Sequence, residues 1–300
     1  MTGPVRAARP RNLVELTALN SQITGQVAFI AGGTDLIIAQ ENLPWPDLII
    51  DITGITGLDF VTVSDAAIHI GAASTMATLA SHAGIQNNLP LLAQAAAQVG
   101  SVQIRNRATL GGNVASAVPA GDLLPVLKCL EAQIEILHRD GRIAVRAFDD
   151  VVIGRGQTSL ESGDLITGIV LPLSGAGDRI SAFGKIGVRE VLTIARLNMA
   201  IVAGFDRTRN KVGDIRIVVG AIGPLPLRLP GVEAVFKDRV VDQLLAEDFL
   251  NALVAAVDNA IPGRYSQYYK RHAITGLGLD LLRALFGRDF FRPPSRVEIA

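Results

Sequence analysis

The sequence predicts an α+β protein of two domains, and three patterns point to this fold class. Residues 26–52 hold two apolar runs around a polar turn, which is typical of a small strand–helix–strand unit. Residues 60–71 and 134–145 each read as a hairpin. Beyond the small, glycine-rich segment 174–178, predicted strands come before predicted helices. We therefore expect domains at residues 1–175 and 178–290 of this 300-residue chain.

The first domain opens on a capped helix. Asn12 and Glu15 stand three residues apart, as in a capping box, and leucines then recur at helical spacing. Asp140 and Gly141 form a favourable hairpin turn between two apolar runs. The expected helices are 13–21, 35–40, 76–83, 90–99 and 123–130, and the expected strands are 26–31, 48–52, 60–63, 68–71, 134–138, 143–145 and 165–171.

The second domain has fewer and longer predicted elements. Strands are expected at 180–186, 195–205 and 215–221, and helices from about Val232 and from Asp248. All three tyrosines fall in a further helical segment near the C-terminus, at Tyr265, Tyr268 and Tyr269. They either pack the terminal helices, the interpretation we favour, or anchor a partner chain.

The composition excludes several classes of protein. The charges balance at 28 basic and 28 acidic residues, so nothing attracts nucleic acid electrostatically. Cys129 is the only cysteine, which rules out an intrachain disulfide and a zinc or iron–sulfur cluster bound by this chain alone. Neither a signal peptide nor an apolar run of bilayer length is present, so we expect a soluble, cytoplasmic protein without a metal site of its own.

Two glycine-rich loops are the candidate binding site. Gly32 and Gly33 follow an apolar strand, and glycines there leave main-chain N–H groups free to meet a phosphate. Gly111 and Gly112 belong to a second loop, which also carries side chains able to bond phosphate oxygens, and Asp122 follows as an acceptor for a sugar or adenine. Two such loops predict a pyrophosphate cofactor held from two sides.

A tight structural turn is the alternative for either glycine pair alone. A Rossmann fingerprint would need G-x-G-x-x-G after a strand. The only similar spacing, at Gly276 and Gly278, has no strand before it and Leu281 in place of the third glycine. We therefore exclude a nicotinamide-type Rossmann site.

Six stretches resemble the FAD-binding medium subunits of molybdenum hydroxylases, a family that includes bacterial xanthine and carbon monoxide dehydrogenases. They occur in the family's order along nearly the whole chain. The stretches are AGGTDL (31–36), QIRNRATLGGN (103–113), PAGDLLPVL (119–127), GDLITGIVLP (163–172), FGKIGVRE (183–190) and GAIGPLPLR (220–228). This chain departs from the family at Thr193, where many members have an aspartate.

The resemblance implies a two-lobed FAD-binding domain of the vanillyl-alcohol-oxidase (PCMH) type, with lobes at about 1–56 and 57–175, followed by a smaller α+β domain with a short antiparallel sheet and helices. It implies that the two loops bind the pyrophosphate of FAD, that Asp122 binds the adenosine end, and that Ile166 and Lys185 line the flavin. The implied cofactor-binding residues are Phe29, Ile30, Ala31, Gly32, Gly33, Thr34, Asp35, Leu36, Thr109, Leu110, Gly111, Gly112, Asn113, Asp122, Ile166 and Lys185.

The resemblance also implies a division of labour between subunits. FAD would be bound non-covalently here, whereas the molybdopterin cofactor and the [2Fe–2S] clusters would lie in a large and a small partner subunit, together a heterotrimer or its dimer. This chain would receive electrons from the clusters and pass them to NAD, a quinone or another acceptor, with no catalytic residue of its own. It would then be an oxidoreductase subunit, with substrate oxidation in a partner.

Three alternatives stay open from the sequence. A lysine near the flavin N1 edge would stabilise an anionic reduced ring, but Lys185 is equally well interpreted as a solvated strand residue. The chain would otherwise be a stand-alone FAD-dependent reductase of the same fold, or a nucleotide-binding scaffold without redox activity. The first would reduce its flavin with NADPH and a small substrate, and the second would be colourless.

Overall fold

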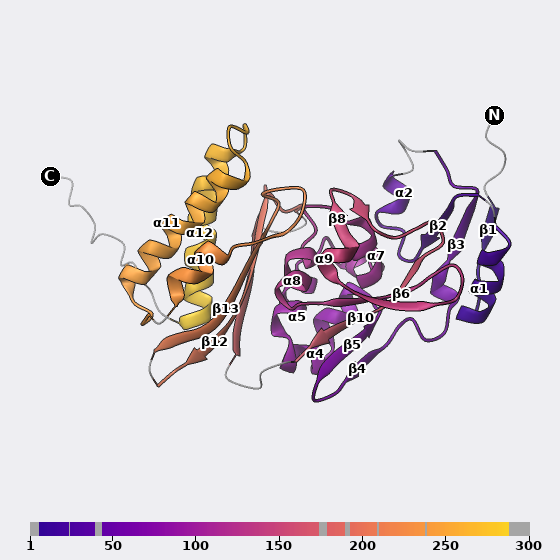
Figure 1. Cartoon of the computed structure of the whole chain (residues 1–300), viewed down its shortest axis with the longest axis horizontal. Helices are drawn as coiled ribbons and strands as arrows, with labels where there is room; N and C mark the ends of the chain where they lie inside the picture. The colour runs from indigo at the N-terminus through magenta and orange to yellow at the C-terminus, as the bar shows by residue number, and fades with distance from the viewer. Residues whose placement is uncertain are drawn as a thin grey trace.

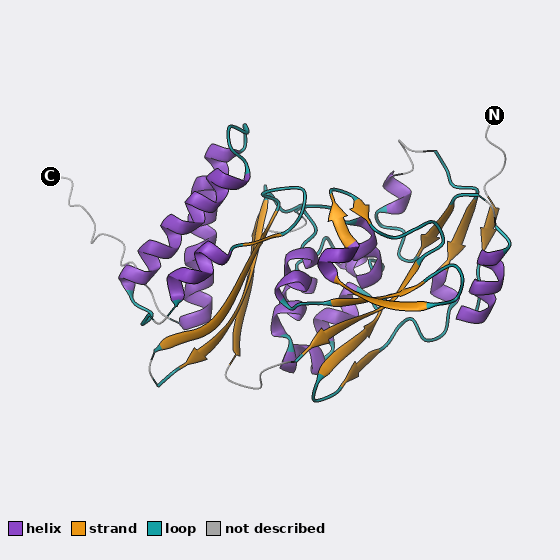
Figure 2. Ribbon diagram, viewed as in Figure 1, coloured by secondary structure: helices purple, strands orange, loops and turns teal. Residues whose placement is uncertain are grey.

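The computed structural model describes residues 6–23, 25–39, 44–173, 179–189, 193–208, 210–237 and 239–287. The chain runs from an N-terminal part with a three-stranded and a five-stranded sheet to a C-terminal part with a four-stranded sheet (Figure 1). Helices and strands occur in both parts (Figure 2), so the predicted α+β class is confirmed. The expected linker at 174–178 lies outside the described residues.

The first sheet contains the predicted strand–helix–strand unit. Its three strands are parallel, in the order β1-β3-β2. Helix α1 is capped as expected, because the Asn12 side chain accepts a hydrogen bond from the Glu15 N–H at 2.8 Å. The elements are β1 (Arg6–Ala8), α1 (Leu13–Ser21), β2 (Val27–Ile30), α2 (Leu36–Ala39), β3 (Leu48–Asp51) and the 3-10 helix η1 (Ile52–Gly54). The short β1 was not predicted, because it has no apolar run.

The second sheet is antiparallel with β10 at its centre, in the order β4-β5-β10-β6-β7. Both predicted hairpins are present, and Gly141 has the positive φ of 87° that favours glycine in its turn. The helix predicted over 76–83 ends at Ser81, because His82 has an extended backbone, and α4 then begins. The elements are β4 (Val61–Val63), β5 (Ala67–Gly71), α3 (Met76–Ser81), α4 (Ala83–Asn88), α5 (Pro90–Ala97), α6 (Val102–Arg105), α7 (Leu110–Ser116), α8 (Leu123–Cys129), β6 (Gln133–Leu137), β7 (Ile143–Ala147), α9 (Phe148–Val151), β8 (Val152–Gly154), β9 (Gln157–Thr158) and β10 (Leu165–Pro172).

The third sheet is antiparallel in the order β11-β12-β13-β14 and comes before the helices, as predicted. Strand β13 begins earlier than expected, because Val212 already pairs with Phe205. Helix α11 also begins early, because the Asp242 side chain accepts a hydrogen bond from the Leu245 N–H at 2.8 Å. The elements are β11 (Arg179–Ile186), β12 (Leu197–Asp206), β13 (Lys211–Gly220), β14 (Leu227–Arg228), α10 (Pro230–Glu233), the 3-10 helix η2 (Ala234–Phe236), α11 (Gln243–Ala260) and α12 (Gln267–Phe286).

Helices cover both faces of this third sheet. Leu197 and Ile201 of β12 belong to the core shared with α11 and α12. Ala200 and Val202 of the same strand belong to the core that contains α5 and α8 of the N-terminal part. Because successive side chains of a strand point to opposite faces, a strand covered on both sides reads as nearly continuously apolar. Figure 1 shows β12 and β13 between the two helical layers, so the two parts of the protein share an extensive interface.

The tyrosine segment does not pack as we expected. Tyr265 precedes α12 and is fully exposed, and Tyr268 and Tyr269 are also exposed. The favoured interpretation, that these tyrosines pack the terminal helices, is therefore wrong for Tyr265 and Tyr268, whereas Tyr269 is 44% exposed. Within the described residues, no helix combines the length and the apolar character that crossing a membrane requires.

Gly276 and Gly278 both lie within α12, so neither belongs to a strand-to-helix nucleotide loop. Their environments differ. A Cβ on the buried Gly278 would lie 2.6 Å from Leu253 Cδ1 of α11, whereas a Cβ on Gly276 would meet nothing within 4 Å. Gly278 thus permits the close approach of α11 and α12.

These two glycines give a matched test of the helix pair. Gly276→Ala should raise the free energy of unfolding by about 0.5–1 kcal/mol, because alanine favours the helix. Gly278→Ala should lower it by about 1–3 kcal/mol, because the methyl group overpacks the contact with Leu253. Chemical denaturation of both variants measures the difference, and equal effects would contradict this close contact.

Candidate functional site

The loop after β2 leaves several main-chain donors free. We define residues 31–36 as the first loop. Gly33 has a φ of 71°, a left-handed conformation that helps successive N–H groups converge on one point. The N–H groups of Gly32, Gly33, Thr34 and Asp35 donate to no acceptor within the described parts of the chain. These groups are partly accessible at the carboxyl end of a parallel strand, so they offer an anion several donors at once.

The second loop, residues 109–113, is a helix start and not the loop we expected, because Thr109 caps α7 and residues 110–113 form its first turn. The Thr109 hydroxyl caps α7 by accepting a hydrogen bond from the Gly112 N–H at 3.2 Å. The N–H groups of Leu110 and Gly111 donate to main-chain carbonyls after β5. Asn113 has an unsatisfied atom, because its Oδ1 is buried without a hydrogen-bond partner among the described residues. The second loop therefore offers a side chain and little free main chain.

The two loops lie against each other. A Cβ on Gly32 would overlap the carbonyl group of Arg107, just ahead of the second loop, so the contact requires glycine. A Cβ on Gly111 would lie 2.6 Å from that of Ala72. Gly112 is exposed instead, and a Cβ there would meet only the capping hydroxyl within 4 Å. Contacts inside the protein explain why glycine is required at positions 32 and 111, whereas Gly112 borders open space.

Ile166 lies close to the second loop. The Ala72 carbonyl accepts a hydrogen bond from the Gly111 N–H at 2.8 Å, and the Ala72 N–H donates to the Thr167 carbonyl at 3.0 Å. Ile166 is the buried neighbour of Thr167 on the central strand β10. The structure thus brings Ile166 close to the second loop, whose Leu110 shares its apolar core.

Asp122 and Lys185 form a buried ion pair between the two parts of the protein. The Lys185 ammonium donates to Asp122 Oδ2 at 2.7 Å, and the side chains are only 6% and 8% exposed. Burial raises the pKa of the Asp122 carboxyl above its ordinary value, and the charge of Lys185 opposes that rise. The interpretation of Lys185 as a solvated strand residue is therefore wrong.

All three donors of the Lys185 ammonium have acceptors. Besides Asp122, they meet the main-chain carbonyls of Gln98 at 2.6 Å and Thr193 at 3.4 Å. Thr193 is buried, and its hydroxyl accepts a hydrogen bond from the Val188 N–H at 3.1 Å. A further acceptor for Lys185 would have to replace one of these contacts, of which the Thr193 carbonyl is the longest.

Asn198 is a residue of this region that the sequence analysis missed. Its side-chain nitrogen donates to Asp122 Oδ1 at 3.3 Å, so residues of β11 and β12 engage both carboxylate oxygens. An asparagine inside an apolar strand matches no motif, and its partner lies 76 positions away. The Asn113 side chain lies 3.6 Å from the position of a Cβ on Gly121, so the ion pair adjoins the second loop.

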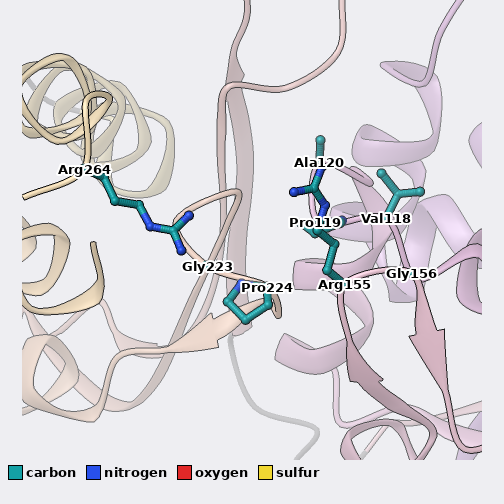
Figure 3. A pocket seen from close by; sticks show the side chains of 8 residues that line it. All are labelled: Val118, Pro119, Ala120, Arg155, Gly156, Gly223, Pro224 and Arg264. Carbon is teal, nitrogen blue, oxygen red and sulfur yellow. The ribbon is translucent and has the colours of Figure 1, made fainter. Parts of the chain in front are cut away.

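A cavity of about 510 Å³ lies between the two parts of the protein, next to this region. Figure 3 shows Arg264 on one side and Arg155, with the segment 118–120, on the other. Neither guanidinium has a hydrogen-bond or ion-pair partner among the described residues. Unpaired arginines at a mostly apolar cavity favour an anionic group with a planar, apolar portion.

Together, these features fit a ligand with a diphosphate. The first loop supplies unpaired N–H donors for its oxygens, and the second supplies the open space beside Gly112. The unpartnered Asn113 Oδ1 is an acceptor, so it suits a hydroxyl or amine of the same ligand and not the diphosphate. The Asp122 carboxylate keeps acceptor capacity, because two oxygens offer about four lone-pair sites. The geometry brings the loops and Ile166 into one group, and Asp122 and Lys185 into a second group beside it.

Known proteins match most of the chain. Residues 3–174 match the family described as the FAD binding domain in molybdopterin dehydrogenase, and residues 182–285 match the CO dehydrogenase flavoprotein C-terminal domain. The chain is 30% identical over 293 residues to the nicotinate dehydrogenase FAD-subunit of Eubacterium barkeri, covering 93% of this chain and 96% of that one. It is 30% identical to the carbon monoxide dehydrogenase medium chain of Hydrogenophaga pseudoflava, covering 84% of each chain.

A solved structure shows the same fold. In carbon monoxide dehydrogenase from Hydrogenophaga pseudoflava, a chain with 26% identity superposes with a TM-score of 0.84, covering 96% of this chain and 100% of that one. The resemblance drawn from the sequence motifs is thereby confirmed. The chain belongs to the family of FAD-binding subunits of molybdopterin dehydrogenases, with that family's FAD-binding domain followed by its flavoprotein C-terminal domain.

Proposed function

We propose that this chain is the electron-transfer subunit of a multi-subunit molybdenum hydroxylase. Two relatives are named as an FAD-subunit and a medium chain, which supports a division of labour among subunits. A small partner would carry [2Fe–2S] clusters, and a large partner would carry the molybdenum cofactor and oxidise the substrate. Bound FAD would supply the redox chemistry, taking electrons from the clusters and releasing them to NAD or another acceptor.

The observation that carries this proposal is the free main chain of the first loop. Four consecutive N–H groups, from Gly32 to Asp35, lack acceptors among the described residues, and Gly32 lies against the main chain at Arg107, just ahead of the second loop. We assign the main chain of 29–36 and the second loop to the pyrophosphate. Donors fixed before the ligand arrives cost little further ordering when they bind an anion.

The remaining residues would hold the two ends of the cofactor. Asp122 would accept a hydrogen bond from the adenosine end with its spare lone pairs. Ile166 would supply an apolar surface for the flavin. Lys185 would act at the Asp122 end of the cofactor and not beside the flavin, because its ammonium lies 2.7 Å from the Asp122 carboxylate. The unpartnered Arg155 and Arg264 mark the interdomain cavity as the place where we expect an anionic acceptor to approach.

Co-purification with the partner chains tests this function. The complex should be yellow, and its flavin should bleach when the substrate of the molybdenum subunit is added without oxygen. Flavin that NADPH and one small substrate reduce in this chain alone would favour a stand-alone reductase. A colourless chain that binds ADP as tightly as FAD would favour the non-redox scaffold.

Gly112→Val tests the placement of the pyrophosphate. The valine side chain would fill the space beside the loops, so FAD affinity should fall at least about 100-fold, a loss of about 2.7 kcal/mol. The fold should survive with some loss of stability, because the new Cβ would lie 2.9 Å from the Thr109 hydroxyl that caps α7 and would meet nothing else within 4 Å. Flavin fluorescence titration and thermal unfolding measure the two effects.

Gly231→Val provides the control. Gly231 is also an exposed glycine in a short helix, and a Cβ there would meet nothing within 4 Å. This variant should bind FAD as the unchanged protein does. Full yellow colour in Gly112→Val would contradict the proposed position of the second loop.

A further inference from the structure

We infer that Asn198 of the C-terminal domain is a positioning residue. It orients the Asp122 carboxylate, which we propose binds FAD. The inference rests on the proposed function, because it takes Asp122 as a ligand of FAD. It adds to that function a residue of the other domain that acts through Asp122, without touching the cofactor itself.

The contacts of Asn198 fix which end of its amide faces Asp122. Its side chain is fully buried on β12, and its nitrogen lies 3.3 Å from Asp122 Oδ1 and 3.4 Å from the Gly121 carbonyl. Both neighbours are acceptors, so the NH₂ end must point toward them. The amide therefore holds the carboxylate and the main chain before it at the same time.

Three strands of the third sheet hold the segment 119–122 together. Lys185 of β11 binds the second carboxylate oxygen at 2.7 Å, and Asn198 of β12 binds the first. At the end of β13, the Ala221 N–H donates to the Pro119 carbonyl at 3.1 Å. With both oxygens engaged from different strands, the carboxylate cannot rotate without breaking a contact.

The carbonyl end of the same amide indicates that Asn198 does not serve stability alone. Its Oδ1 is buried and has no hydrogen-bond partner among the described residues, which is unfavourable in a strand surrounded by apolar side chains. Gly220 stands directly opposite on β13, and a Cβ there would overlap this oxygen. Gly220 thus leaves space for the Asn198 amide. An apolar side chain at position 198 could pack there without leaving an unsatisfied polar atom.

Gln94 supplies a second side-chain contact between the domains, which does not involve Asp122 and comes from an exposed residue, whereas Asn198 is buried. Its Oε1 accepts a hydrogen bond from the Phe183 N–H at 2.9 Å, so it also joins α5 of the first domain to β11 of the second. If Asn198 merely joined the domains, loss of Gln94 would have the same consequence for FAD as loss of Asn198.

The experiment compares four variants of the full chain: Asn198→Ala, Gly220→Ala, the double variant and Gln94→Ala. FAD dissociation constants come from fluorescence titration, and apoprotein unfolding temperatures come from thermal scans. Asn198→Ala should weaken FAD binding about ten-fold, the usual scale of a hydrogen bond to a charged group. Gly220→Ala should do the same, because its methyl group displaces the amide.

The double variant should bind FAD no worse than Asn198→Ala, because alanine at 198 leaves room for the added methyl group. Gln94→Ala should stay within about two-fold of the unchanged protein. The apoprotein of Asn198→Ala should unfold at a somewhat lower temperature, because Asp122 Oδ1 and the Gly121 carbonyl lose their shared donor, a cost that removal of the unsatisfied Asn198 carbonyl offsets only in part.

The inference is overturned if Asn198→Ala binds FAD normally, if Gln94→Ala is equally impaired, or if the losses of the two single variants add. Losses of FAD affinity that merely follow the losses of apoprotein stability, in Asn198→Ala and Gln94→Ala alike, would also overturn it, by showing a structural role. Failure of the unchanged protein to bind FAD would instead refute the proposed function.

Discussion

The candidate site depends on the close approach of the Gly32 main chain to the Arg107 carbonyl. Any side chain at Gly32 would separate the two loops, because its Cβ would occupy the place of that carbonyl. The first loop contributes unpaired N–H groups at the end of a parallel strand. The second contributes Gly112, which borders open space. Neither loop provides both, so the arrangement that suits a diphosphate arises only where they meet.

The C-terminal domain takes part in this site through the third sheet. Because β12 is covered on one face by its own helices and on the other by α5 and α8, the sheet lies directly against the segment that begins α8. Asp122 stands at that point, and its pairing with Lys185 crosses the interface. Removing one partner of a buried ion pair leaves an uncompensated charge, so this pair also fixes how the two domains meet.

Much of the fold was predictable, because its signals are local. The cap at Asn12, the Asp140–Gly141 turn and the apolar runs of β2 and β10 each depend on residues near one another in the sequence. The glycine loops were found for the same reason. Helix α4 and strand β1 were missed, since a single extended residue and a three-residue strand leave almost no pattern.

The rest of the site depends on contacts between distant parts of the chain. Nothing near Asn198 in the sequence shows that Asp122 and Gly220 lie beside it. Likewise, the burial of Lys185 follows from α5 and α8 covering its strand, and the exposure of Tyr265 from its position before α12. Such features follow from the assembled sheet and its two helical layers, which periodicity alone does not specify.

A crystal structure of this chain with bound FAD would locate the cofactor relative to both loops. We expect the diphosphate between the first and second loops, with its oxygens within hydrogen-bond distance of the N–H groups of 32–35 and with Gly112 facing it. A diphosphate bound elsewhere, or an FAD that leaves these N–H groups without contact, would show that the loops do not form the binding site.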